Sequence, residues 1–439
     1  MSKLLPSLRA LRVFMSVAQS GSISKSAELI YRAPSALTRS IHDLEACLDV
    51  ELFERKARGM LLTSSGEAVL RRAEQIREEL LDGWCRLGEA GQNLRGAEGG
   101  AILAGLFNRK KLSLFVDLAD HQHMPAVAKL HGVSQPAVSM AIRELEHALG
   151  VRLFDRTAKG IILTGSGDIL ACHARRAIAI LKLIRQDLAA LRGNIEGRVT
   201  IGALPLGRTM ILPTAIAHLV TQHPNLSVQT IESPYEVLAT GLRNGAIDFI
   251  FGAIRPHGAA LDFDTESLFI DEISLVARLG HPLTKKRVLS MHDLLDAKWV
   301  LSRPGTPACE TVARAFENEG FDAPSPVVAT GDLAILRCLL LQSDLITAIS
   351  AHQLLYEIAD GKLQILDFHL EGTKREIGIT TRSGAKSSPA ATCLISEIRS
   401  VIAIGGATPP QSGTVIPCQI PAGSKPASRT IQACWPAIS

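Results

Sequence analysis

The stretch that decides the fold of this chain is Ser134-Gln-Pro-Ala-Val-Ser-Met-Ala-Ile-Arg-Glu-Leu-Glu146, followed by Leu149-Gly150. Ser134 is a favourable N-cap, and Pro136 is tolerated in a first helical turn because the N–H that proline lacks would have no partner there. Apolar residues then recur at three- and four-residue spacing, namely Val138, Ile142, Leu145 and Leu149. Since Gly150 can end a helix, we predict a helix that runs to about Leu149.

Two further helices are predicted before this stretch. Residues 112–119 show the apolar spacing of an amphipathic helix, and residues 124–130 are expected to form a shorter one. The turn His131-Gly-Val133 joins the short helix to the longer one and contains a glycine that can adopt positive φ. Two helices joined by a tight turn are typical of the helix-turn-helix arrangement.

A wing and a long helix are predicted after the stretch. Two short strands around residues 157–160 would form the wing, and Ser166 is expected to cap a helix that reaches about Arg192. Polar side chains on the outer face of the 134–149 helix could reach base edges, while wing cations suit phosphates. The candidates are Gln135, Ser139, Met140 and Arg143 on the helix, and Arg156 and Lys159 in the wing.

The same pattern occurs a second time upstream. Residues 11–73 align with residues 112–174 at a constant offset of 101 and without a gap. The most similar run is Leu52-Phe-x-Arg55 against Leu153-Phe-x-Arg156. We infer a tandem duplication of one small module. The glycine-rich stretch 96–105 is predicted to be a mobile linker between the copies.

The charge of the chain changes sign where the repeat ends. Residues 1–193 carry 27 Lys+Arg against 20 Asp+Glu, which is +7, and residues 194–439 carry 20 against 23, which is −3. A basic portion joined to a slightly acidic one indicates a part that binds a polyanion and a part that has a different function. Because the basic half coincides with the repeat, we favour DNA binding over a bare helix bundle with solvated charges.

No pattern for catalysis or for a cofactor stands out. The eight cysteines include no CxxC pair, and the close pair of histidines, His121 and His123, lacks further ligands at metal-site spacing. The motifs GxSxG, HExxH and the P-loop are absent from the sequence. We therefore predict that the protein is not an enzyme and has no catalytic residues, no cofactor and no metal site.

Membrane insertion is not expected, although the mean hydropathy is +0.19. The most apolar stretch, residues 333–349, is interrupted by Arg337 and Asp344, whereas a spanning helix needs about 18 or more apolar residues. The first ten residues lack the apolar core of a secretory signal. We expect a cytoplasmic protein without a membrane partner.

Beyond Gly193 short apolar strands alternate with helices. Strands are predicted at 198–202, 226–231, 247–252, 273–277, 299–301 and 346–349, and helices at 209–223, 235–244, 291–296, 309–319 and 332–341. Such alternation predicts parallel sheets with crossover helices, arranged as two small α/β lobes over residues 196–402. The proline- and glycine-rich remainder, 403–439, is predicted to be a disordered tail.

A ligand of such a fold is expected in the crevice at the carboxyl ends of the strands. Helix N-termini there offer free N–H groups to an anion or a hydroxyl. The polar candidates for effector binding are Arg208, Thr209, Ser302, Arg303, Thr306, Thr330 and Asp332. Ser302, Thr306 and Asp332 could instead be helix caps, and the two arginines could be solvated.

The run from Ser134 to Glu146, with Leu149-Gly-Val-x-Leu-Phe-x-Arg156 and Leu163-Thr-x-x-Gly167, resembles the winged helix-turn-helix of LysR-type transcriptional regulators. The C-terminal half is similar to the effector domain of the same family, which is related to type-2 periplasmic binding proteins. That similarity is carried by Arg198-Val-x-Ile-Gly202, Leu212-Pro213 and Gly245-x-Ile-Asp248. The resemblance covers roughly residues 8–400.

The resemblance implies a DNA-binding transcriptional regulator whose modules bind double-stranded operator DNA. An effector would close the two lobes and change the recruitment of RNA polymerase, and the long helix after the wing would mediate dimerisation in a homodimer or homotetramer. The run Gly202-Ala-Leu-Pro-Leu-Gly-Arg-Thr209 resembles the branch named for the galactose-binding-protein regulator. This branch implies a sugar or a small carboxylate as effector, and Arg208 and Arg303 favour an anion.

The two copies depart from the family pattern in complementary places. The second copy has the expected Gln135 but carries Met140 where the family usually has Arg or Lys. The first copy keeps Arg39 there, but Pro34 replaces the glutamine and Asp49 replaces the helix-ending glycine. Either both copies touch DNA, or the second copy reads DNA and the first has become a packing or dimerisation element. The resemblance adds these DNA-binding candidates: Ser134, Pro136, Ser35, Thr38, Arg39, Arg55 and Arg58.

The predicted organisation therefore has six segments. Two winged helix-turn-helix copies occupy 8–66 and 111–167, a helix and linker occupy 67–110, a dimerisation helix occupies 168–193, the effector domain occupies 196–402 and the tail occupies 403–439. The competing prediction is a small-molecule-binding protein whose headpieces mediate protein–protein contacts and not DNA binding.

Overall fold

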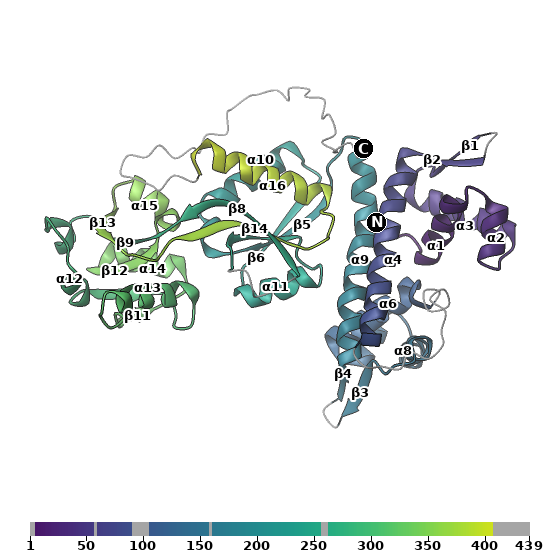
Figure 1. The fold of residues 1–439 in the computed structure, drawn as a ribbon, viewed down its shortest axis with the longest axis horizontal. Coiled ribbons are helices and arrows are strands. Elements are labelled where there is room, and N and C mark those ends of the chain that lie inside the picture. Colours follow the sequence, from purple (N-terminus) through teal and green to yellow (C-terminus); the bar gives the residue numbers. More distant parts are fainter. Residues whose placement is uncertain (1–4, 57–58, 90–104, 158–159, 256–261, 407–439) are drawn as a thin grey trace. The chain divides into compact units, whose positions relative to one another are not determined.

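The computed structural model describes residues 5–56, 59–89, 105–157, 160–255 and 262–406 (Figure 1). The chain forms two compact units, one of residues 1–204, 223–267 and 377–395 and one of residues 205–222, 268–376 and 396–439. Within the described ranges, none of the helices has the length and apolar character needed to cross a membrane. The predicted linker, apart from Gly105, and residues 407–439 of the predicted tail lie outside these ranges.

The N-terminal part of the first unit contains the same order of elements twice. Module 1 consists of α1 (Leu8–Ser20), α2 (Ile23–Leu29), α3 (Pro34–Leu48), β1 (Phe53–Lys56) and β2 (Gly59–Leu62). Module 2 consists of α6 (Arg109–His121), α7 (Met124–His131), α8 (Gln135–Leu149), β3 (Phe154–Thr157) and β4 (Gly160–Leu163). Each strand pair is an antiparallel hairpin, with Phe53 opposite Leu62 and Phe154 opposite Leu163.

The helix predicted after Ser134 and the predicted wing are present in module 2, with two differences from the prediction. The short helix α7 includes His131, which was expected in the turn, and ends at Gly132 with φ 61°. Thr164, and not Ser166, caps the long helix that follows the wing, because its Oγ1 accepts a hydrogen bond from the N–H of Gly167 at 3.0 Å. Ser166 lies buried in the first turn of that helix.

A long helix follows each wing, and the two helices pack against each other. These are α4 (Ser64–Glu89) and α9 (Gly165–Leu191), which run antiparallel in Figure 1. Their buried apolar residues fall at equivalent positions, 101 residues apart: Val69 and Leu170, Ala73 and Ala174, Ile76 and Ala177, Leu80 and Leu181, and Leu87 and Leu188. Both modules and both helices share one continuous hydrophobic core.

The first large sheet has the strand order β6-β5-β7-β14-β8. Its strands are β5 (Gly197–Ala203), β6 (Leu226–Ile231), β7 (Phe249–Ala253), β8 (Phe263–Asp271) and β14 (Arg375–Arg382). Strand β5 pairs in parallel with β6 and β7, whereas β14 runs antiparallel to β7. In the sequence, α11 (Tyr235–Arg243) lies between β6 and β7, and α16 (Pro389–Val401) follows β14.

The second large sheet has the strand order β11-β10-β12-β9-β13. Its strands are β9 (Ile273–Arg278), β10 (Lys298–Leu301), β11 (Val328–Ala329), β12 (Leu345–Ser350) and β13 (Leu363–His369). The helices of the second unit are α10 (Ile211–Gln222), α12 (Met291–Leu295), α13 (Pro307–Asn318), α14 (Leu333–Gln342) and α15 (Leu355–Ala359), with the 3-10 turns η1 (Pro205–Arg208), η2 (Pro282–Lys285) and η3 (Ala351–Leu354).

Both sheets are mixed, so the prediction of parallel sheets is confirmed for β5, β6 and β7 and for β10, β11 and β12 but is wrong for β9, β13 and β14. Strand β9 runs antiparallel to both β12 and β13. Antiparallel neighbours do not require a crossover helix, and the chain therefore adds strands that the strand–helix alternation does not reveal. The start of the predicted tail is also corrected, because residues 403–406 belong to the last helical turn, η4 (Ile402–Gly406).

Candidate functional site

The third helix of each module is fastened to its wing by the same carboxylate. Glu45 in α3 accepts a hydrogen bond from the N–H of Leu52 at 2.8 Å, and Glu146 in α8 accepts one from the N–H of Leu153 at 2.9 Å. Each glutamate thereby satisfies a backbone donor at the start of the wing. The position of the wing relative to the third helix is therefore fixed in the same way in both modules.

A threonine and a glycine close the other side of each wing. Thr63 donates to the carbonyl of Glu51 at 2.7 Å and accepts from the N–H of Gly66 at 2.9 Å. Thr164 makes the equivalent bonds, to the carbonyl of Arg152 at 2.8 Å and from Gly167 at 3.0 Å. A Cβ atom on either glycine would lie 2.2 Å from a backbone carbonyl oxygen, so the helix can approach the wing this closely only at glycine.

Module 2 exposes most of the residues predicted to contact DNA. Ser134, Gln135, Pro136, Met140 and Arg143 are exposed at the start and along the outer face of α8, and Met140 has 57% of its surface accessible. Ser139 is half-buried, and its Oγ accepts a hydrogen bond from Nη2 of Arg143 at 3.1 Å. The predicted residues of α8 thus share one accessible surface. The buried Val138, Ile142 and Leu145 on the opposite face of α8 hold the helix against the core.

Module 1 presents the equivalent surface with different chemistry. Ser35, Thr38 and Arg39 are exposed on α3, and the Thr38 hydroxyl donates to the carbonyl of Pro34 at 3.1 Å. The helix ends at Asp49 in the left-handed region, φ 57°, where module 2 has Gly150 with φ 71°. A left-handed aspartate is tolerated but less favourable than glycine.

The four predicted wing cations are only partly covered by the structure. Arg55 lies on β1 and Arg156 lies on β3, at equivalent positions of the two hairpins. Arg58 and Lys159 lie outside the described residues. The contribution of these side chains to DNA binding therefore stays a prediction.

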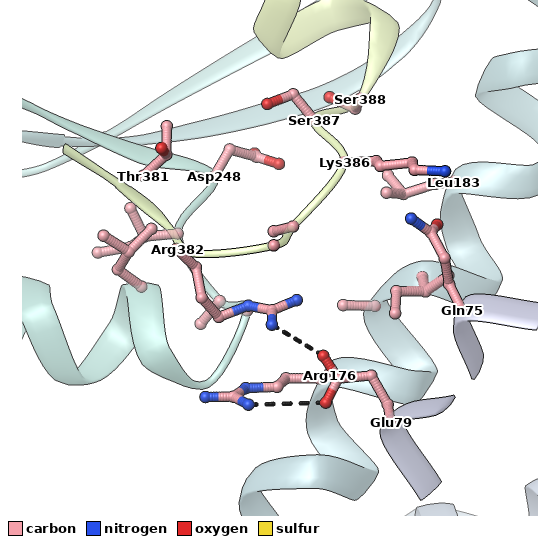
Figure 2. A pocket seen from close by; sticks show the side chains of 18 of the residues that line it. Gln75, Glu79, Arg176, Leu183, Asp248, Thr381, Arg382, Lys386, Ser387 and Ser388 are labelled. Atoms are coloured by element: carbon pink, nitrogen blue, oxygen red, sulfur yellow. Dashed lines mark ion pairs between the residues drawn. The ribbon is translucent and has the colours of Figure 1, made fainter. Parts of the chain in front are cut away.

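The helix pair carries a network of buried charges that sequence reasoning did not identify. Glu79 of α4 is hydrogen-bonded to His173 at 3.0 Å and forms ion pairs with Arg382 at 2.8 Å and Arg176 at 3.6 Å; the two ion pairs are drawn in Figure 2. Burial would raise the pKa of Glu79, but the His173 hydrogen bond and the charges of Arg382 and Arg176 together hold the pKa below its ordinary value.

A buried arginine of α4, Arg72, also bridges the two helices. Arg72 donates through Nε and Nη2 to the two carboxylate oxygens of Asp187 at 2.6 and 3.1 Å, and through Nη1 to the carbonyl of Lys386 at 2.9 Å. The signal in the sequence is the occurrence of Arg72 and Glu79 inside the apolar spacing of α4. Arg176 of α9 is also buried, with 8% of its surface exposed.

A cavity of about 770 Å³ lies beside this network (Figure 2). It is lined by the helix pair, by β5 and by the segment 381–388, which includes Thr381, Lys386, Ser387 and Ser388. Asp248 lines it as well, and burial raises the pKa of this carboxyl, although the N–H of Thr200 hydrogen-bonds to it at 2.7 Å. The walls of the cavity are therefore rich in charged and hydroxyl groups.

Five of the residues predicted to bind an effector lie at one edge of the second sheet. Strands β10, β11 and β12 are parallel, so their carboxyl ends share an edge. Ser302, Arg303 and Thr306 follow β10, and Thr330 and Asp332 follow β11. The guanidinium of Arg303 lies beside Gly331, since a Cβ atom on that glycine would be 3.7 Å from Nε. Thr209 follows η1 and donates to the carbonyl of Gln353 in η3 at 3.3 Å.

Several of these residues also stabilise local structure. Thr306 caps α13 by accepting from the N–H of Cys309 at 3.4 Å, and Asp332 caps α14 by accepting from the N–H groups of Ala334 and Ile335 at 2.8 and 3.0 Å. Thr330 accepts from the N–H of Asp332 at 3.1 Å. Arg208 is half-buried and Arg303 is exposed. Arg208 lies in the last turn of η1, and Arg303 follows β10 directly after Ser302.

The second compact unit contains a buried ion pair that the sequence did not suggest. Asp271, at the end of β8, pairs with Arg375 at 2.9 Å and accepts from the hydroxyl of Ser350 at 2.7 Å. Burial lowers the pKa of the neighbouring His352 imidazole, although the charge of Asp271 opposes this. Asp271 and Arg375 are 104 residues apart, so no local pattern could reveal the pair.

Comparison with known proteins gives consistent matches along the chain. The family described as "Bacterial regulatory helix-turn-helix protein, lysR family" matches residues 8–67 and again residues 109–168, and "LysR substrate binding domain" matches residues 192–403. The "HTH-type transcriptional regulator GalR" of Pseudomonas putida is 45% identical over 398 residues, covering 91% of this chain and 98% of that relative.

Two further proteins extend these matches. The "HTH-type transcriptional regulator GbpR" of Azospirillum brasilense is 29% identical over 291 residues, covering 66% of this chain and 85% of that relative. A solved full-length OxyR variant from Pseudomonas aeruginosa has a similar fold, with a TM-score of 0.52 and 23% identity over 66% of this chain and 94% of that one. The two curated relatives are named as transcriptional regulators.

Proposed function

This chain belongs to the LysR family of bacterial transcriptional regulators, with a helix-turn-helix DNA-binding part and an α/β effector-binding domain, and we propose that both of its modules bind double-stranded DNA. The observation that carries this proposal is the equivalent attachment of the third helix to its wing in the two modules. Glu45 and Glu146 hold α3 and α8 to their wings at matching distances, and both helices expose an arginine, Arg39 or Arg143.

The first module keeps the features that DNA binding needs. A helix that had become only a packing element would bury its outer face, whereas Ser35, Thr38 and Arg39 are exposed on α3. Phosphate binding depends on accessible cations, and Arg39 supplies one on this face. We therefore favour two DNA-binding modules, formed by residues 8–66 and 111–167. The alternative, in which only the second module binds DNA, is less consistent with this exposure.

For the C-terminal half we propose a small anionic effector, such as a carboxylate, bound at the edge formed by β10, β11 and η3. Helix N-termini and backbone N–H groups at this edge favour negative charge, and Arg208 and Arg303 add cationic side chains. The effector domain would span 196–402, with two lobes related to periplasmic binding proteins. Effector binding would then alter how a homodimer or homotetramer meets DNA and RNA polymerase, through different affinities for two conformations.

DNA binding is tested by measuring the affinity of the full chain for a fluorescent duplex between 50 and 200 mM salt. We expect affinity to fall steeply with salt, and Arg143→Ala and Arg39→Ala each to reduce the slope of log K against log salt by about 1. Arg314→Ala, an exposed arginine of α13, is the matched control and should leave the slope unchanged. A salt-independent interaction would instead support headpieces that bind proteins.

The effector proposal is tested by isothermal titration of the full chain with a panel of sugars and of aromatic and aliphatic acids. We expect one of the carboxylates to bind, and Arg303→Ala to weaken its binding about tenfold, the size of a lost charge-assisted hydrogen bond. Arg314→Ala again serves as control. Tight binding of an uncharged sugar that is indifferent to Arg303→Ala would refute the anionic effector.

A further inference from the structure

We propose that a single chain is a complete two-headed DNA reader, in which the pairing of α4 with α9 presents α3 and α8 of the same chain to one bipartite DNA site whose two halves differ in sequence. This inference rests on the DNA binding proposed above. It adds that the two heads that occupy one site belong to one chain.

The first support is the polar pairing between the two long helices. Arg72 near the start of α4 is bonded to Asp187 near the end of α9, whereas Glu79 further along α4 is bonded to His173 nearer the start of α9. Gly83 lies one turn beyond Glu79, and a Cβ atom there would be 2.9 Å from the Cβ of His173. These contacts fix an antiparallel register, and they are made by partially or wholly buried groups that would be costly to separate.

The second support is that each apolar stripe already has its partner. The buried positions of α4 and α9 match at an offset of 101, from Val69 and Leu170 to Leu87 and Leu188. A helix with an apolar stripe must cover it against another element, and here the covering helix is supplied by the second copy in the same chain. The resemblance implies that such a helix mediates dimerisation between chains; in this chain α4 takes the place of that partner helix on α9.

The third support is the attachment of the pair to module 1. Arg185, late in α9, donates to the carbonyl of Cys47 at 2.7 Å, and Arg192, just after α9, donates to the carbonyl of Asp49 at 2.8 Å. Both carbonyls lie at the C-terminal end of α3, where unpaired carbonyls favour cations. The helix that begins at the wing of module 2 thus ends on the third helix of module 1.

The geometry of the pair suits a DNA site of two parts. Helix α4 begins directly after the wing of module 1 and α9 begins directly after the wing of module 2, so in an antiparallel pair the wings are attached near opposite ends. The 26 residues of α4 correspond to ~39 Å of helix at ~1.5 Å per residue. Successive exposures of the major groove on one side of B-DNA are ~34–36 Å apart, which is a comparable length.

The two faces cannot read the same bases in the same way. On α8 the exposed side chains are Gln135, Met140 and Arg143, whereas the equivalent positions 34, 39 and 42 of α3 hold Pro34, Arg39 and His42. Gln135 can form a bidentate bond with adenine and Pro34 cannot, and Arg39 can bond guanine where Met140 offers only apolar contact. A two-fold symmetric dimer reads an inverted repeat, but two different helices predict two different half-sites.

The test compares a chain in which both modules are intact with a mixture of chains in which each chain has only one intact module. A duplex is first selected from a random-sequence pool by the full-length wild-type chain. The affinity of that duplex is then measured for wild type, for Arg39→Ala, for Arg143→Ala and for an equimolar mixture of the two variants that has been unfolded and refolded together. Circular dichroism and thermal unfolding of every sample confirm that these exposed substitutions leave the fold intact.

We expect each variant to bind about tenfold more weakly than wild type and the mixture to bind no more tightly than the better variant. Recovery of wild-type affinity by the mixture would overturn the inference, because heads from two chains would then share one site. Failure of the wild-type chain to enrich any duplex, or loss of affinity only with Arg143→Ala, would instead overturn the proposed DNA binding by two modules.

Discussion

In module 1 the ring centroids of Phe14 and Phe53 lie 5.2 Å apart, and in module 2 those of the equivalent Phe115 and Phe154 lie 5.6 Å apart. The hydrogen bonds of Glu45 and Glu146 differ in length by only a tenth of an ångström. The positions that hold each wing against the first and third helices have therefore kept their residue types and similar distances.

The faces directed away from these cores differ at nearly every position. Met140 is at the position equivalent to Arg39, and Gln135 is at the position equivalent to Pro34. Close-packed positions admit few side chains because a change of one methyl group is felt by the neighbours, whereas exposed positions admit many. The comparison teaches that the two modules share one scaffold and expose two different surfaces.

The strongest test of the shared scaffold replaces the glycine behind each wing. Gly66→Ala and Gly167→Ala should each destabilise the folded chain by about 3 kcal/mol or more, because the new Cβ would meet a backbone carbonyl oxygen at 2.2 Å. Gly165→Ala is the control, since a Cβ there meets nothing within 4 Å. Chemical unfolding gives the values, and tolerance of the substitution in only one module would break the equivalence.

A smaller effect is expected where the long helices differ. Glu79 has Ile180 as its equivalent in α9, so its charge network has no second copy. Glu79→Gln should lower the free energy of unfolding at pH 7 by about 2 kcal/mol, because His173, Arg176 and Arg382 lose the carboxylate that they surround.

The same variant gives a pH test with a defined sign. The pKa of Glu79 is lower in the folded chain than in the unfolded chain, so its stabilisation is present above the unfolded value of about 4.3 and is lost as the pH falls through the folded value. Wild type should therefore lose stability below about pH 4.5 more steeply than Glu79→Gln does. Parallel stability curves for the two proteins would rule out this role of Glu79.

Exchange of one residue between the exposed surfaces of the third helices should change the affinity for DNA in opposite directions. Met140→Arg should tighten binding to mixed-sequence duplex DNA about fivefold, and Arg39→Met should weaken it to a similar extent, because one cation–phosphate contact is gained or lost. Both side chains are exposed, so thermal unfolding should be nearly unchanged. Fluorescence anisotropy at two salt concentrations measures the change, and no response to Arg39→Met would remove module 1 from the interface.

The smallest effect concerns the end of the third helix. Asp49→Gly should stabilise the chain by up to about 1 kcal/mol, because Asp49 has φ 57° and glycine adopts this conformation without strain. Gly150→Asp should destabilise it by a similar amount. The hydrogen bond from Arg192 is made to the Asp49 backbone and survives the first substitution. Thermal unfolding of both variants would expose any asymmetry between the modules.

Much of this architecture could be predicted from the sequence because it depends on the spacing of apolar residues and helix-ending residues that are close together in the chain. The helix after Ser134 begins and ends within one residue of the prediction, since Val138, Ile142 and Leu149 mark its inner face and Gly150 its end. The cap of α9 was assigned to the wrong hydroxyl. Thr164 and Ser166 are chemically equivalent as caps, and only the bond of Thr164 to the carbonyl of Arg152 across the wing separates them.

The features that the sequence did not reveal depend on contacts between distant segments. Strands β13 and β14 were missed because antiparallel pairing adds them without a crossover helix. Glu79 and Arg382 lie 303 residues apart in the chain, and nothing local connects them. Candidate effector residues, by contrast, could be placed at one sheet edge, because the carboxyl ends of parallel strands must meet there.

The most direct measurement is a hydroxyl-radical footprint of the full-length chain on a duplex that it has selected from a random pool. We predict two protected segments of different sequence, separated by about one helical turn, with Arg39→Ala removing protection from one segment and Arg143→Ala from the other. A single protected segment that disappears with Arg143→Ala and ignores Arg39→Ala would contradict the claim that both modules bind DNA.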